Sequence, residues 1–161
     1  MPQWTLFEQD FRVIDETLGE LIERTNSVSV HLVDRSGQLI TSSGRVGDLD
    51  PTGFASLIAA EFTANAELAQ MLGDQGVDAV VSEGKSRSVY SCLLADRVIM
   101  ATVFDRRSSL GLVRFRAKRA AAGLDGVFRN LLEKVGLSEV AGAETEFAGL
   151  AEQQVDALFG D

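Results

Sequence analysis

The helical pattern from Asp50 to Gly73 separates two groups of strand-like runs, and this arrangement constrains the fold more than any other feature of the chain. Asp50 and Pro51 suit the start of a helix, because Asp can accept free backbone N–H groups and Pro needs no donor in the first turn. The glycine at position 73 is expected to end the helix. Its apolar face is expected to comprise Phe54, Ile58, Phe62, Ala69 and Leu72.

The remaining pattern predicts an α+β fold. Strands are expected at residues 27–34, 39–43, 77–82, 87–94 and 97–104, and amphipathic helices at about 6–25 and from 112 to Gly136. Apart from the central helix, the links between strands are short turns, so neighbouring strands should run antiparallel. The order α-β-β-α-β-β-β-α then gives one five-stranded antiparallel sheet. The two end helices should cover one face, while the central helix covers the other or crosses an edge.

The run Val98 to Phe104 is almost continuously apolar, which predicts a central strand covered on both faces. The chain of 161 residues suits one domain, expected over residues 1–136, followed by an acidic tail at 137–161. The first half of this tail reads as a loop. Its end is amphipathic and should dock in a groove of a partner or of its own domain.

Charge and composition exclude several functions. Lys and Arg number 15 against 24 Asp and Glu, which gives a net charge of −9 and argues against general nucleic-acid binding. Cys92 is the only cysteine, so no internal disulfide can form. The start of the sequence lacks the features of a signal peptide, and no apolar run is long enough to span a bilayer. A cytoplasmic protein without stable membrane insertion is expected.

The sequence offers no catalytic, metal-binding or cofactor-binding set. Gly84-Lys85-Ser86 resembles the end of a phosphate-binding loop, but the earlier glycine of that motif is missing and a strand follows. A single histidine, His31, cannot form a multi-histidine metal site and is expected at a strand surface or interface. Cys92 is expected to pack within its apolar strand.

A basic cluster precedes and begins the last helix. A nucleotide phosphate, an anionic lipid or an acidic protein would each suit these side chains, and a solvated helix face is the simpler alternative. The cluster comprises Arg106, Arg107, Arg114, Arg116, Lys118 and Arg119.

Several stretches together resemble one protein family. They are LVDRSGQLITSSG at Leu32 to Gly44, the helix from Phe54 to Gly73, VFDRRSSLGLVRFRAKRA at Val103 to Ala120, and the tail FAGLAEQQVDALFG. On these residues the chain resembles the MglB-like members of the roadblock/LC7 domain family. The run Phe-Asp-x-x-x-Ser-Leu-Gly-Leu-Val-Arg is the most specific part of the resemblance.

The resemblance implies a homodimer, formed through the central helix and a sheet edge, that binds a bacterial Ras-like GTPase of the MglA type. Such a protein activates GTP hydrolysis without a catalytic residue of its own and takes part in cell polarity or motility, which implies enrichment at a cell pole. It needs no cofactor, since GTP and Mg²⁺ belong to the partner. The implied contact positions are Ala60, Thr63, Ala64 and Glu67 on the helix and Phe147, Leu150, Val155, Leu158 and Phe159 in the tail.

Thr63 and Glu67 depart from the small side chains that the resemblance implies for the surface facing the GTPase. Two alternative functions remain open from the sequence. One is a roadblock scaffold that dimerises and recruits partners without activating them. The other is a small-molecule sensor of the PAS or profilin-like type, which would need a polar-lined pocket inside the sheet.

Overall fold

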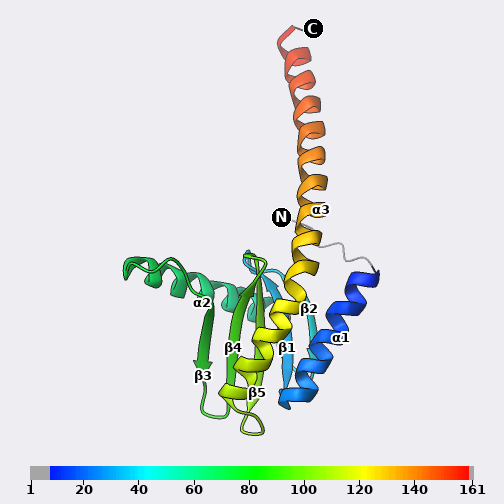
Figure 1. The fold of residues 1–161 in the computed structure, drawn as a ribbon. Coiled ribbons are helices and arrows are strands. Elements are labelled where there is room, and N and C mark those ends of the chain that lie inside the picture. Colours follow the sequence, from blue (N-terminus) through cyan, green and yellow to red (C-terminus); the bar gives the residue numbers. More distant parts are fainter. Residues whose placement is uncertain (1–7, 160–161) are drawn as a thin grey trace.

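The computed structural model contains one five-stranded sheet and three helices, in the predicted α-β-β-α-β-β-β-α order (Figure 1). It describes the backbone of residues 8–159 and the side chains of residues 8–134. The elements are α1 (Glu8–Thr25), β1 (Ser29–Asp34), β2 (Leu39–Gly44), α2 (Pro51–Met71), β3 (Ala79–Glu83), β4 (Arg87–Leu94), β5 (Val98–Asp105) and α3 (Leu110–Phe159).

All strand pairs in the sheet are antiparallel, and the spatial order is β2-β1-β5-β4-β3. The prediction of a central, doubly covered fifth strand is confirmed, because β5 lies between β1 and β4 and is buried over most of its length. Its side chains alternate between the two layers. Val98 and Met100 pack toward α1 and α3, whereas Ile99 and Ala101 pack toward α2.

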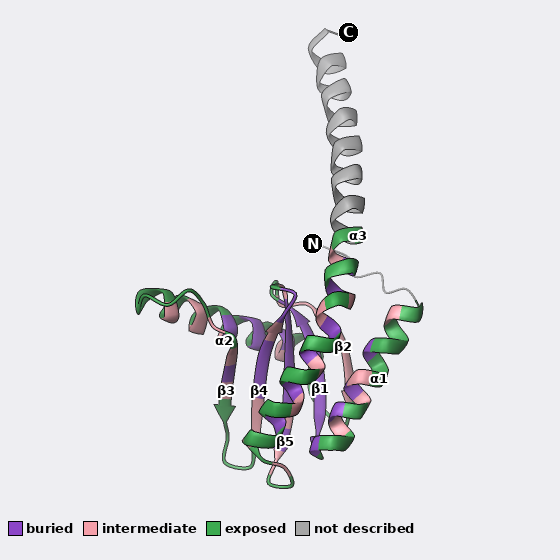
Figure 2. Ribbon diagram, viewed as in Figure 1, coloured by how far each residue is buried: buried purple, intermediate pink, exposed green. Residues whose placement is uncertain are grey.

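Helices cover both faces of the sheet, and of the two predicted positions for the central helix the structure shows the one on the second face. The larger core lies beneath α1 and α3 and includes Ile14, Leu18, Leu124 and Phe128. The smaller core lies beneath α2 and is built around Phe62. Figure 2 shows the buried residues in the strands and on the sheet-facing sides of the helices. The two outer surfaces of the molecule are therefore separated by the sheet.

The ends of α2 follow the predicted signals with one exception. Asp50 occupies the N-cap position and Pro51 begins the helix, but the Asp50 carboxylate makes no capping hydrogen bond. At the other end Gly73 adopts a φ of +85°, and the N–H groups of Gly73 and Asp74 donate to the carbonyls of Gln70 and Ala69. This is the Schellman arrangement, for which glycine is favoured.

The prediction that the last helix ends at Gly136, followed by a loop-like segment, is wrong. The backbone of α3 is helical over 50 residues, from Leu110 to Phe159. A single interior glycine costs only about 1 kcal/mol relative to alanine, and no proline follows Gly136 to stop the helix. Gly123 and Gly126 lie inside the same helix. A helix of this length extends about 75 Å.

Candidate protein-binding site

One side of α2 packs against the sheet, and the opposite side carries mainly small and polar side chains. Ile58 and Phe62 are buried against the sheet, together with Ala55 and Ala59. The side chains on the other sides of the helix are mostly exposed. All four predicted contact positions on the helix, Ala60, Thr63, Ala64 and Glu67, are exposed.

These four residues line one groove. Its second wall is the turn between β1 and β2, formed by Arg35, Ser36 and Gly37, and its volume is about 450 Å³. The structure thus brings together the helix positions that the sequence resemblance selected, and it adds a turn that sequence reasoning did not select. The remaining lining residues are Ser56 and Ala59.

A buried carboxylate holds that turn in place. Asp34 is the last residue of β1, and its side chain is fully buried. One of its oxygens accepts hydrogen bonds from the backbone N–H and the hydroxyl of Ser36, and the other accepts from Arg97 Nε at 3.0 Å. Because a buried carboxylate must be paired, this network fixes the groove wall relative to the sheet.

Gly37 brings the turn close to the helix. Its φ is +94°, a conformation that suits glycine, and its N–H donates to the Asp34 carbonyl at 2.8 Å. A Cβ atom at this position would lie 3.5 Å from the Ser56 Cα. The turn and the helix are therefore in near contact at the base of the groove.

The groove combines small residues with charged ones. Its floor consists of the small residues Ala59, Ala60 and Ala64, which lets a partner helix or loop approach the backbone closely. Arg35 and Glu67 supply opposite charges at the rim. Within residues 8–134, no group of three or more His, Cys, Asp or Glu side chains could hold a metal ion.

A stripe of exposed apolar residues continues from the groove along α2. Leu57 is 72% exposed, Leu68 57% and Met71 83%, and their spacing of 11 and 14 residues places them on the same side of the helix. The C-terminal part of α2 also projects past the edge strand β3 (Figure 1). An exposed apolar stripe of this kind marks an interaction surface.

Sequence reasoning missed this stripe and misplaced one of its neighbours. Leu72 was expected on the buried face, but it is 85% exposed. The final turn of α2 lies beyond the sheet edge, so no strand is available to cover it (Figure 1). The recurrence of Leu57, Leu68 and Met71 on one side of the helix was the sequence signal that could have revealed the stripe.

The expectation that His31 lies at a surface is wrong. The side chain is buried between β1 and α2, where its ring contacts Phe54 with a centroid separation of 4.6 Å. Its Nε2 and Nδ1 atoms lie 2.9 and 2.8 Å from the hydroxyls of Ser29 and Ser42. Burial lowers the pKa of His31 to about 4, so the ring is neutral near pH 7.

The other predicted residues have varied outcomes. Cys92 is buried in β4, as expected, and burial raises the pKa of its thiol to about 12, which keeps it protonated. Gly84 to Ser86 form the turn between β3 and β4, as predicted. The side chains of the predicted tail contacts Phe147, Leu150, Val155, Leu158 and Phe159 lie outside the described residues.

The structure is a small α+β domain with an exposed groove on α2. The family model for the roadblock/LC7 domain matches residues 13–104. The chain therefore belongs to the roadblock/LC7 family. A search of curated protein sequences finds no match. No helix among the described residues is long and apolar enough to cross a membrane.

Solved structures of MglB proteins are similar to this chain. MglB from Myxococcus xanthus is 36% identical, with a TM-score of 0.73, and the match covers 79% of this chain and 96% of that protein. The gliding protein MglB from Thermus thermophilus is 24% identical over 79% and 96% of the two chains, with a TM-score of 0.74. An MglB with a tetrameric arrangement is 25% identical over 82% and 99%, with a TM-score of 0.76.

Proposed function

We propose that this protein is a dimeric regulator that activates GTP hydrolysis by a bacterial Ras-like GTPase of the MglA type. The observation that carries the proposal is the 36% identity to Myxococcus xanthus MglB over nearly the whole of that protein. The groove on α2 supports it, because the four helix positions implied by the family resemblance line one surface. The proposed role connects the protein to cell polarity or motility.

The chemistry of the groove suits an activator without catalytic residues. Its floor is apolar and small, and its charged groups, Arg35 and Glu67, lie at the rim. A protein of this type would favour the hydrolysis-competent arrangement of the GTPase by binding that state more tightly than the others. GTP and Mg²⁺ would be held by the partner.

The dimer is part of the proposal. The apolar stripe of Leu57, Leu68 and Met71 would pack against the same stripe of a second copy, and the edge strand β3 would extend the sheet. Two-fold pairing would place two grooves near one another. A single GTPase could then contact residues from both copies.

The proposal is tested by single-turnover GTP hydrolysis with the cognate Ras-like GTPase. Wild-type protein should accelerate hydrolysis, and Ala64→Arg should abolish both binding and acceleration, because a long cationic side chain would fill the groove floor. The matched control is Ala122→Arg, which changes an exposed alanine on the opposite side of the sheet. Acceleration should survive in this control.

Other outcomes separate the alternatives. Binding without acceleration would overturn the activating role and favour a roadblock scaffold that recruits partners. Unchanged affinity of the Ala64→Arg variant would overturn the assignment of the groove as the binding site. Failure to bind any Ras-like GTPase would overturn the proposed function, but not the fold or the family assignment.

A further inference from the structure

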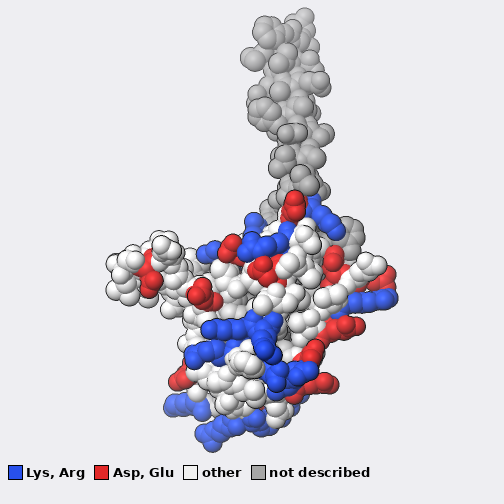
Figure 3. Space-filling model, in the orientation of Figure 1, with Lys and Arg blue, Asp and Glu red and all other residues white. Residues whose placement is uncertain are grey.

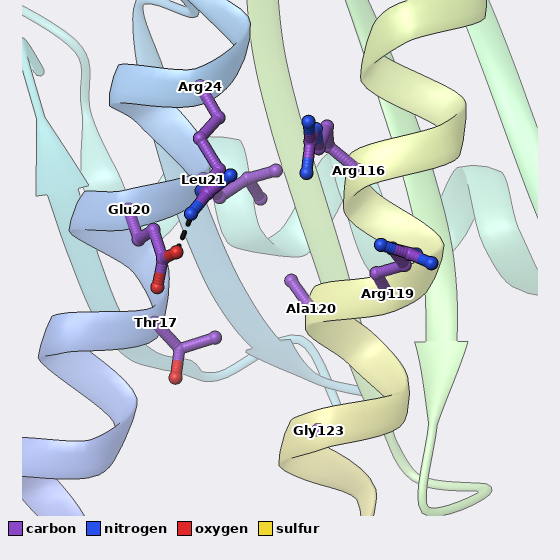
Figure 4. A pocket seen from close by; sticks show the side chains of 8 residues that line it. All are labelled: Thr17, Glu20, Leu21, Arg24, Arg116, Arg119, Ala120 and Gly123. Carbon is purple, nitrogen blue, oxygen red and sulfur yellow. Dashed lines mark hydrogen bonds and ion pairs between the residues drawn. The ribbon is translucent and has the colours of Figure 1, made fainter.

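A second pocket lies on the opposite side of the sheet, in the seam between α1 and α3 (Figure 4). Its volume is about 320 Å³, which is within the range of small-ligand sites. It shares no residue with the α2 groove. The lining residues are Thr17, Glu20, Leu21 and Arg24 from α1 and Arg116, Arg119, Ala120 and Gly123 from α3.

The pocket carries an excess of positive charge. Three arginines line it against one carboxylate, and Glu20 already accepts a hydrogen bond from Arg24 Nε at 2.7 Å. Arg116 and Arg119 therefore add two positive charges that no lining carboxylate balances. Figure 3 shows a group of blue side chains at the middle of this face, with red side chains beside them. This excess of positive charge would attract an anion into the pocket.

The two α3 arginines are positioned by an aromatic ring. The guanidinium carbons of Arg119 and Arg116 lie 4.9 and 5.6 Å from the centre of the Phe115 ring. Such cation–π contacts limit the conformations of long side chains. Figure 4 shows Arg116 directed into the space between the helices, Arg24 turned along α1 toward Glu20, and Arg119 lying over α3 itself.

Arg116 also has an unsatisfied donor. Its Nε atom is buried and has no hydrogen-bond partner within the described part of the chain. A buried donor without an acceptor is costly, so the present packing around this nitrogen is unfavourable. The seam thus combines positive charge, an unpartnered arginine donor and a preformed cavity.

We propose that this pocket binds the phosphate group of a small organic phosphate. The excess of two positive charges matches a phosphomonoester dianion better than a carboxylate, and guanidinium groups bind phosphate through paired hydrogen bonds. The pocket is larger than a lone phosphate requires, and Leu21 and Ala120 form an apolar wall for the organic part. Of the three ligands suggested by the basic cluster, a phosphate carried by a nucleotide-sized molecule fits this seam best.

The test is isothermal titration of the full-length protein at fixed ionic strength, with 5′-AMP, ribose 5-phosphate, inorganic phosphate and adenosine as separate probes. At least one phosphomonoester should bind saturably, inorganic phosphate should bind more weakly, and adenosine should not bind. Arg119→Gln and Arg116→Gln should each weaken binding at least tenfold. Arg119 is exposed, so its substitution should not disturb the fold.

Arg114→Gln is the matched control, since Arg114 lies on the same helix but over the Tyr90 ring, outside the pocket. Its affinity should stay within twofold of the wild type. An equal loss in Arg114→Gln would show non-specific ionic binding and overturn the proposal, as would the absence of any saturable phosphate binding. If inorganic phosphate bound as tightly as the phosphomonoesters, the proposed contact between the apolar wall and the organic part of the ligand would be overturned.

Discussion

At the scale of single residues, His31 shows how a polar side chain becomes part of a core. Its neighbours in β1 alternate between the two faces of the sheet, and both faces are covered. The serine hydroxyls of Ser29 and Ser42 satisfy the two ring nitrogens, so the neutral ring can be buried beside Phe54. Protonation would place a charge between the sheet and α2.

The protein should therefore lose stability when the pH falls from 6.5 toward 4. The pKa of His31 is about 4 in the folded state and about 6.5 in the unfolded state, so the unfolded chain binds more protons within this range. Between pH 7 and pH 5 the loss attributable to His31 should be about 2 kcal/mol. Urea unfolding of the full chain at both pH values would measure it.

The control for this prediction is His31→Asn, which removes the titrating group and keeps a side chain able to hydrogen-bond. The variant should be less stable at pH 7 because the ring contact with Phe54 is lost. Its change in unfolding free energy between pH 7 and pH 5 should nevertheless be smaller than that of the wild type by about 2 kcal/mol. An equal pH dependence in both proteins would contradict the role of His31.

The sequence could not reveal this burial. Val28, Val30 and Leu32 identify one buried face, and the alternate positions read as polar and solvated. Whether the second face is covered depends on where α2 packs, and the sequence left two possibilities for that helix. The alternation of apolar residues predicted the strand correctly. Only the folded structure shows that its buried polar side chains form hydrogen bonds with one another and with Ser42.

At the scale of elements, the predictable features are those with strong local signals. Turn residues and apolar alternation predicted the five strands, and Gly73 correctly predicted the end of α2. The C-terminal end of α3 had no such reliable signal. Gly136 resembles a helix stop, but a glycine inside a helix lowers its stability only slightly. The groove wall at residues 35–37 was also missed, since only folding brings this turn beside α2.

The exposed stripe of α2 leads to a prediction about self-association. Leu68→Glu should weaken the proposed dimer at least tenfold, because it would place two carboxylates within an apolar helix pair. Sedimentation equilibrium over a range of protein concentrations would measure the dissociation constant. Since Leu68 is 57% exposed, circular dichroism should show the helix content of the wild type.

Leu112→Glu is the matched control for this experiment. Leu112 is an exposed leucine on α3, on the face of the sheet opposite α2. The same substitution there should leave the dissociation constant unchanged within twofold. If Leu112→Glu separated the copies and Leu68→Glu did not, the association surface would lie on the α3 side.

At the scale of the whole molecule, the sheet separates two surfaces of different chemistry. The α2 side offers a groove with a small-residue floor and an apolar stripe, which suit protein contacts. The α1 and α3 side offers a pocket lined by arginines. A ligand on one side would not block the other, so the phosphate site and the proposed GTPase site can be tested independently in one protein.

The division between domain and tail can be tested by ending the chain after Gly136. Among the described residues, the core of α3 runs from Val113 to Leu131, with Leu132 packed against it. A chain of residues 1–136 retains all of these side chains and the entire sheet, so its thermal unfolding midpoint should stay within a few degrees of the full-length value. Acceleration of GTP hydrolysis should also persist, because the groove on α2 is unchanged. A large drop in the midpoint would show that residues after 136 stabilise the domain. Loss of acceleration with an unchanged midpoint would instead assign the activating contact to residues 137–161, and the groove would then serve binding alone.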